Sequence, residues 1–90
     1  EEVEEALKLN SAVSDCTVVG ATDERWGPAV TAVVQLNEPR TVDGEALRAD
    51  VRQRLAGYKI PKRVVFVDRI HRGPNGKSDY RWAREIAEPE

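Results

Sequence analysis

Residues 71–77 are the part of the sequence whose residue types and spacing are best suited to chemistry. In Gly73-Pro74-Asn75-Gly76-Lys77, four turn-forming residues lead directly into one lysine. Gly76 tolerates backbone angles that other residues avoid, and it leaves room for a ligand to approach closely. A lysine on such a loop is a point charge suited to a phosphate or a carboxylate. On these residues alone, a solvated turn lysine is the simpler explanation.

Other reactive residue types occur singly. The chain has one histidine, His71, and one cysteine, Cys16. Cys16 lies in a β-branched stretch, where a buried and unreactive thiol is the default, and a lone His71 is expected at the surface. The sequence has no Ser/His/Asp grouping, no set of metal ligands and no phosphate-binding P-loop. We therefore predict no metal site and no self-sufficient enzyme.

The composition fits one globular domain over residues 1–90. Hydrophobic residues make up 40% and charged residues 33%, and no apolar run approaches the roughly 20 residues of a transmembrane helix. No secretory signal opens the chain, and a single cysteine allows no internal disulfide, so we expect a reducing, cytoplasmic setting. The chain lacks methionine and starts abruptly with an acidic run. We interpret it as a piece of a longer protein.

The net charge of −2 hides an uneven distribution. Residues 1–58 carry six Lys or Arg and eleven Asp or Glu, whereas residues 59–84 carry eight and two, a net of +6. A basic block in an acidic chain suggests an anionic partner, although a solvated surface is the commoner explanation. Single-stranded nucleic acid is a weaker candidate, because few aromatic residues accompany the basic ones: Tyr58, Phe66, Tyr80 and Trp82.

Residue patterns predict the element order α-β-β-α-β-α. Strands are expected over residues 15–21, 29–36 and 63–70, and helices over the first ten residues, after Asp43 and over 78–88. The first two strands are close in sequence, so they are expected to pair antiparallel. The fold class is therefore α+β, with a small sheet of about three strands, an antiparallel hairpin plus a third strand, packed with helices.

The second helix has the clearest boundary signals. Asp43 is a plausible N-cap, and Gly57 stands where a helix C-terminal glycine belongs. One apolar stripe is formed by Leu47, Val51 and Leu55, spaced four residues apart.

Four segments, in order and with matching spacing, resemble motifs of one family. They are Glu2–Leu7, similar to an opening helix that follows a hinge; Val18–Gly27, similar to "VVGxPDERWG"; Leu55–Lys62, similar to "LAxYKxPK"; and Arg72–Lys77, similar to "PRxxxGK". Over nearly all 90 residues the chain resembles the small C-terminal domain of adenylate-forming acyl-CoA synthetases. It departs from that family at His71, where proline is usual, and Gly76–Trp82 is most similar to bacterial fatty-acyl or sterol-side-chain CoA ligases.

The resemblance implies a lid domain of a larger two-domain ligase. In that family a carboxylate and ATP give acyl-AMP and pyrophosphate, and CoA then displaces AMP to form a thioester. The C-terminal domain swings between these steps against its own N-terminal adenylation domain. The resemblance implies ATP with magnesium and CoA as cofactors of the full-length enzyme, and none bound to the isolated domain, which is not expected to be active. The carboxylate is expected to be fatty or sterol-derived, with no nucleic-acid partner.

The resemblance also assigns roles to individual residues. Lys77 matches the family's catalytic lysine, whose charge offsets the negative charge of the reacting carboxylate and α-phosphate. Trp26 and Tyr58 match positions that contact CoA in some members, and Lys59 and Lys62 are expected near CoA phosphates. For Trp26 and Tyr58, packing at the domain edge is an equal alternative. Arg72 is expected to be a loop anchor or an interface residue.

Two other functions stay open on the sequence. Within the same group, the chain could be the lid of a peptide synthetase adenylation domain, whose thiol belongs to a carrier protein. Outside it, the chain could be a small module that binds an anionic polymer through residues 59–84.

Overall fold

The computed structural model describes residues 2–23, 27–40 and 42–88, with the backbone alone at 21–23, 27–29 and 58, and it confirms the order α-β-β-α-β-α. The elements are α1 (Glu2–Lys8), β1 (Val13–Asp23), β2 (Gly27–Leu36), α2 (Gly44–Val51), a 3-10 turn η1 (Gly57–Lys59), β3 (Arg63–Val67) and α3 (Tyr80–Ala87). No helix among these residues is long and apolar enough to cross a membrane.

The strands form one three-stranded sheet in the order β1-β2-β3. β1 and β2 pair antiparallel from Val13 opposite Leu36 to Asp23 opposite Gly27, which confirms the predicted hairpin. β3 runs parallel to β2, because the segment containing α2 carries the chain back along the sheet before β3 begins. The sheet is therefore mixed, and the α+β fold class is confirmed.

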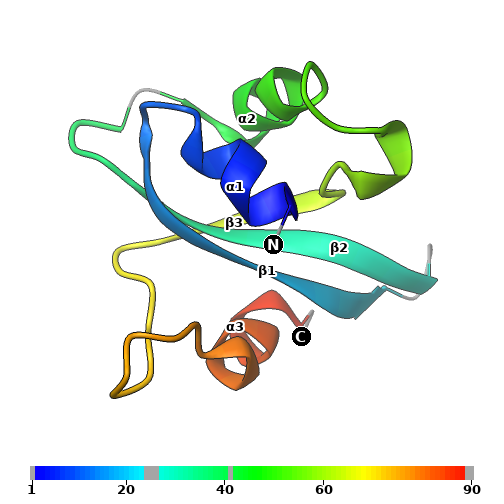
Figure 1. The fold of residues 1–90 in the computed structure, drawn as a ribbon. Coiled ribbons are helices and arrows are strands. Elements are labelled where there is room, and N and C mark those ends of the chain that lie inside the picture. Colours follow the sequence, from blue (N-terminus) through cyan, green and yellow to red (C-terminus); the bar gives the residue numbers. More distant parts are fainter. Residues whose placement is uncertain (1, 24–26, 41, 89–90) are drawn as a thin grey trace.

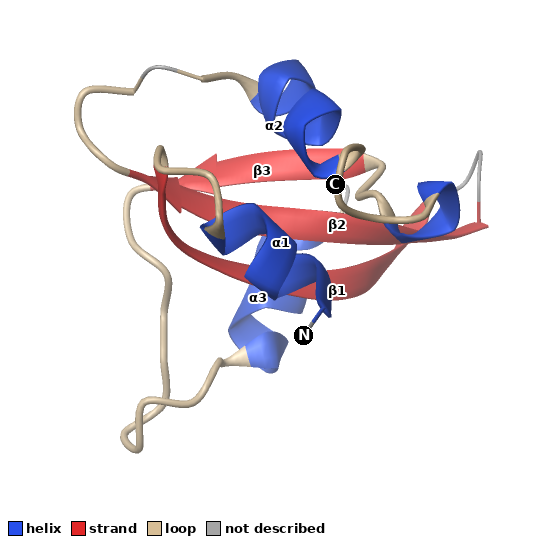
Figure 2. Cartoon of the chain, turned by 45° about the horizontal axis from the view of Figure 1, so that its top comes forward, coloured by secondary structure: helices blue, strands red, loops and turns tan. Residues whose placement is uncertain are grey.

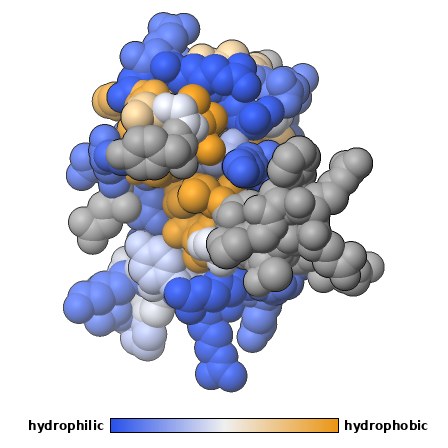
Figure 3. All heavy atoms as spheres, turned by 90° about the vertical axis from the view of Figure 1, so that its right-hand side faces the viewer, coloured by the Kyte–Doolittle hydropathy of each residue, from blue (hydrophilic) through white to orange (hydrophobic). Residues whose placement is uncertain are grey.

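Helices cover both faces of this sheet (Figures 1 and 2). α1 and α2 lie on one face, and α3 lies on the other. Seen from the end that carries the β1–β2 connection, hydrophobic residues reach the surface in the middle and the upper part of the molecule, and hydrophilic residues lie at the top and the bottom (Figure 3). The domain therefore has two hydrophobic cores, one on each face of the sheet.

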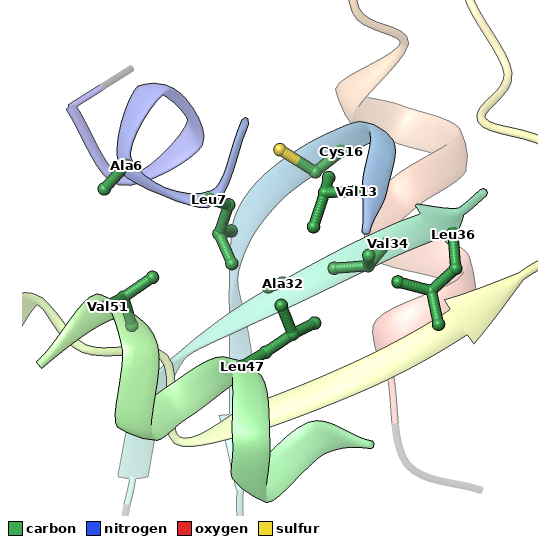
Figure 4. Packing of buried hydrophobic residues seen from close by; sticks show 9 residues of the cluster. All are labelled: Ala6, Leu7, Val13, Cys16, Ala32, Val34, Leu36, Leu47 and Val51. Carbon is green, nitrogen blue, oxygen red and sulfur yellow. The ribbon is translucent and has the colours of Figure 1, made fainter. Parts of the chain in front are cut away.

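The larger core lies between the sheet and the α1/α2 layer (Figure 4). Leu47 and Val51 of α2 are fully buried there, which confirms two positions of the predicted stripe. Leu55, the third position, lies beyond α2 but still packs against this cluster. A register shift between Val13 and Asp15 gives β1 one extra residue, which brings Val13 to the same face as Cys16.

The smaller core lies under α3. Ala83 and Ala87 of α3 are fully buried and pack with Val19 and Val33 of the sheet and with Ile70. Alanine side chains let the helix approach the strands closely. This close packing holds α3 against the sheet.

The predicted start of α2 is confirmed, but its predicted end at Gly57 is not. Asp43 does cap α2, since its side chain accepts a hydrogen bond from the Ala46 amide at 2.9 Å. The prediction that Gly57 ends this helix is wrong. α2 ends at Val51, irregular turns follow it, and Ala56 is already extended (φ −62°, ψ 148°), so Gly57 starts η1.

β3 and α3 are shorter than predicted. β3 ends at Val67 instead of residue 70, yet Ile70 remains buried and its amide donates to Gln35 Oε1 at 2.8 Å. α3 starts at Tyr80, after Asp79, whose side chain accepts from the Trp82 amide at 3.0 Å. This N-cap separates the helix from the preceding loop.

Two buried hydroxyls under α3 give a stability test. Thr17 and Thr31 are fully buried, and neither Oγ1 has a hydrogen-bond partner among the described residues. Burying an unpaired hydroxyl costs about 1–3 kcal/mol, so we expect Thr31→Val to stabilise the chain by about 1 kcal/mol. Thermal unfolding should then show a melting temperature about 4–8 °C higher. A lower melting temperature would mean that this hydroxyl has a partner.

Candidate functional site

Lys77 lies on a tight loop, residues 71–79, which joins β3 to α3 and extends away from the sheet (Figure 2). The loop tip is closed by two backbone hydrogen bonds of 2.9 Å, from the Gly76 amide to the Gly73 carbonyl and from the Gly73 amide to the Lys77 carbonyl. Gly76 has φ +81°, a left-handed conformation that favours glycine. The Asn75 side chain also accepts from the Lys77 amide at 3.2 Å. The tip therefore presents Lys77 on an ordered backbone.

The base of the loop is fastened across its two arms. Arg72 and Ser78 form an isolated antiparallel bridge. One residue further out, His71 Nδ1 lies 3.1 Å from Asp79 Oδ2, and the His71 ring lies 5.8 Å from that of Trp82. His71 is exposed, as predicted, and in this structure it fastens the loop base.

Arg72 joins the loop to the sheet. Its Nε donates to Asp15 Oδ2 at 2.9 Å, and its Nη2 donates to Asp15 Oδ1 at 2.6 Å. This is the two-point geometry in which a guanidinium binds a carboxylate most strongly. Of the two roles predicted for Arg72, loop anchor or interface residue, the structure confirms the loop anchor.

Asp15 lies among groups that favour its charged form. Burial alone would raise the pKa of Asp15, but hydrogen bonds from Arg72 and from the Cys16 amide, with the charges of Arg72 and Lys8, lower it below its ordinary value. The hydrogen bond to Asp15 correspondingly raises the pKa of Arg72. The pair is therefore fully ionised at neutral pH.

Lys77 opens onto a hollow of about 660 Å³. Its lining residues are Glu4, Lys8, Arg72, Lys77, Ser78 and Tyr80. Lys8 and Arg72 already pair with Asp15, and Glu4 accepts from the Val18 amide at 2.8 Å. Lys77 is exposed and has no ion-pair partner among the described residues. Of the three cations that line this hollow, Lys77 is therefore the one available to bind an anion.

The two predicted CoA-contacting lysines lie away from the hollow of Lys77. Trp26 is outside the described residues, and only the backbone of Tyr58 is described, in η1. Lys59 pairs with Glu2 at 2.5 Å. Lys62 lines a second hollow, of about 360 Å³, with Asp43, Gly44, Glu45, Arg48 and Val64. Among the described residues, this hollow shares no lining residue with that of Lys77, so the two lysines lie at different hollows.

Two further predictions concern the reactive residue types. Cys16 is fully buried, and burial raises the pKa of its thiol to about 12, so the buried and unreactive thiol is confirmed. Within residues 2–23, 27–40 and 42–88, no group of three or more His, Cys, Asp or Glu could hold a metal ion.

Much of the basic block is used inside the domain. Lys59 pairs with Glu2, Arg72 with Asp15 and Arg81 with Glu85, while Arg63 donates to the Ala87 carbonyl at 2.7 Å. These contacts are scattered over different elements rather than gathered in a stripe. This scatter argues against the alternative that residues 59–84 form a binding surface for an anionic polymer.

The residue that the sequence analysis missed is Asp15. A charged residue in a stretch of β-branched residues is unusual for a strand, and this was the available signal. Its partner Arg72 is 57 positions away, so nothing local in the sequence pairs them.

One family of known proteins is similar to this chain. Residues 2–77 match the family model of the AMP-binding enzyme C-terminal domain. The chain is 52% identical over 85 residues to 3-oxocholest-4-en-26-oate–CoA ligase of Rhodococcus rhodochrous, covering 94% of this chain and 15% of that protein. It is 51% identical over 87 residues to medium-chain acyl-CoA ligase Mig of Mycobacterium avium, covering 97% and 16%. The chain thus spans about a sixth of the length of these curated relatives.

Solved structures share the fold. A fatty acyl CoA synthetase of Mycobacterium tuberculosis superposes with a TM-score of 0.87 at 33% identity, covering 98% of this chain and 18% of that one. The amide bond synthetase McbA of Marinactinospora thermotolerans also gives 0.87, at 37% identity, covering 97% and 18%.

The ion pair between Asp15 and Arg72 predicts a pH dependence of stability. Because the folded-state pKa of Asp15 is lowered, its contribution is complete above its ordinary value of 3.8 and is lost as the pH falls through the folded value. We expect Asp15→Asn to be less stable than the natural chain at pH 7, with a difference that shrinks below about pH 4. Urea unfolding at several pH values measures this, and a difference that stays constant down to pH 2 would contradict it.

Proposed function

Because the chain belongs to the family of AMP-binding enzyme C-terminal domains, we propose that it is the mobile lid of a longer ATP-dependent acyl-CoA synthetase. The carboxylate attacks the α-phosphate of ATP, which forms acyl-AMP and releases pyrophosphate. The CoA thiol then attacks the acyl carbon and AMP leaves. ATP, with its magnesium ion, and the acyl group are held by the N-terminal adenylation domain, so the isolated lid is inactive. We also propose that this ligase is located in the cytoplasm.

One observation carries the proposal: Lys77 is an exposed cation on a loop that is closed at its tip and fastened to the sheet. In the first step, negative charge collects between the carboxylate and the α-phosphate. A positioned ammonium offsets that charge most strongly where water is excluded, as it is when a lid closes. Lys77 thus acts by charge and position, and neither Cys16 nor His71 takes part.

The second step uses a different part of the domain. Lys62 follows the segment that carries Tyr58 and Lys59 in the sequence, and it lines a hollow whose described lining residues differ from those at Lys77. A lid that turns about a hinge can present one hollow and then the other to the same acyl group. We assign Lys62 and Lys59 to the CoA phosphates, and Trp26 and Tyr58 to the rest of CoA.

The names of the relatives support a choice of substrate and acceptor. Proteins about 50% identical to the chain are CoA ligases for a sterol-derived acid and for medium-chain acyl groups. We propose fatty or sterol-side-chain acids as substrates. The amide bond synthetase is less similar, at 37%, so CoA is preferred to an amine as the acceptor.

Replacing Lys77 tests the first step. In the full-length ligase, Lys77→Ala should lower the rate of acyl-AMP formation roughly 100- to 1,000-fold, because removing one stabilising group from a charged transition state costs about this much. Release of pyrophosphate from ATP and a medium-chain fatty acid measures the rate. Arg81→Ala, at a side chain that is 92% exposed on α3, is the control and should be normal. Acyl-AMP formation at the natural rate in Lys77→Ala would refute this role.

Replacing Lys62 tests the second step. Lys62→Ala should raise the KM for CoA about tenfold, the effect of one charge-assisted hydrogen bond, and leave acyl-AMP formation unchanged. Thioester formation from supplied acyl-AMP, measured against CoA concentration, gives the KM. If the KM for CoA is unaltered, or if acyl-AMP formation falls as well, the assignment to CoA is wrong.

A further inference from the structure

We propose that Asp15 is a positioning residue for Lys77, acting through Arg72 to hold the Lys77 loop in the orientation needed for acyl-AMP formation. The inference rests on the proposed function and adds to it a residue on β1, far from Lys77 in the sequence. It predicts that loss of the Asp15 carboxylate impairs one half-reaction and spares the other.

The guanidinium of Arg72 binds the sheet and the loop at the same time. Two of its nitrogens bind the Asp15 carboxylate, at 2.9 and 2.6 Å. The third, Nη1, donates to the Gly76 carbonyl at 3.3 Å and to Ser78 Oγ at 3.2 Å. Gly76 and Ser78 are the two neighbours of Lys77, so the lysine is held on both sides by one planar group.

Asp15 is a firm point of attachment. It lies on β1 opposite Gln35, directly after the register shift, and its side chain is only 22% exposed. Besides Arg72, its Oδ1 accepts from the Cys16 amide at 2.9 Å and lies 3.4 Å from Lys8 Nζ. Three elements therefore meet at this carboxylate: α1, β1 and the Lys77 loop.

The tip of the loop has little other support. Residues 74–77 are exposed. Apart from the bonds of Arg72, the hydrogen bonds of the tip among the described residues join residues within the loop itself. The left-handed turn at Gly76 gives the tip its shape but does not orient it against the sheet. Without the Asp15 carboxylate, Arg72 would still touch the loop, but both could turn together relative to β1.

Such a change should affect rate more than binding. Misplacing a catalytic group by about 1 Å can cost about 100-fold in rate. We expect Asp15→Asn to lower the kcat of acyl-AMP formation by about 10- to 100-fold in the full-length ligase. The KM values for ATP and acid should change little, because both substrates bind to the other domain. Thioester formation from supplied acyl-AMP and CoA should stay within about twofold of the natural rate, since Lys77 is not used in that step.

Two substitutions separate geometry from charge. Arg72→Lys keeps the charge but loses the two-point contact, so it should behave like Asp15→Asn. Asp15→Glu keeps a carboxylate and should recover part of the rate. Asp50→Asn is the matched control, because Asp50 of α2 pairs with Arg54 at comparable exposure, 25% and 34% against 22% and 29%. It should leave both steps unchanged.

The outcomes distinguish this inference from the proposed function. If Lys77→Ala abolishes acyl-AMP formation while both Asp15→Asn and Arg72→Lys keep the natural rate, the positioning role is overturned and the lid function stands. If Lys77→Ala itself forms acyl-AMP normally, the proposed function fails. Equal loss of both half-reactions in Asp15→Asn and Arg72→Lys would mean a general structural role, and it would also overturn the inference.

Discussion

The orientation of Lys77 depends on the ion pair between Arg72 and Asp15. The tip of the loop that carries the lysine is exposed, and a backbone turn alone sets its shape but not its direction. A carboxylate at the edge of the sheet supplies the direction, because it is held by β1 and by a lysine from α1. The burial that would disfavour its charge is outweighed by hydrogen bonds and by two cations, so the pair can be half-buried and still ionised.

The rest of the fold fits the proposal that one small domain serves two steps. Among the described residues, the sheet has helices on both faces and a separate small core on each side. Two hollows among the described residues are open and hold different cations: Lys77 lines one and Lys62 lines the other. A domain of this kind contributes side chains to a site on a partner, and turning it exchanges one set of side chains for the other.

Local patterns in the sequence predicted much of this arrangement and missed its long-range contacts. The N-cap at Asp43 and the buried stripe of Leu47 and Val51 follow from helix periodicity, and they were predicted correctly. Gly57 was misplaced because the helix ends six residues earlier, in turns that carry no glycine signal. The direction of β3 and the pairing of Asp15 with Arg72 join residues distant in sequence, and periodicity holds no information about such contacts.

The central claim is that this domain delivers Lys77 to a carboxylate and an α-phosphate held by another domain. The most direct measurement is acid-dependent exchange of pyrophosphate into ATP by the N-terminal part of the ligase, without the 90-residue chain and then with it added. We predict slow exchange without the chain, faster exchange with the natural chain, and no increase with the Lys77→Ala chain. Full exchange by the N-terminal part alone, or an equal increase with both chains, would contradict the account.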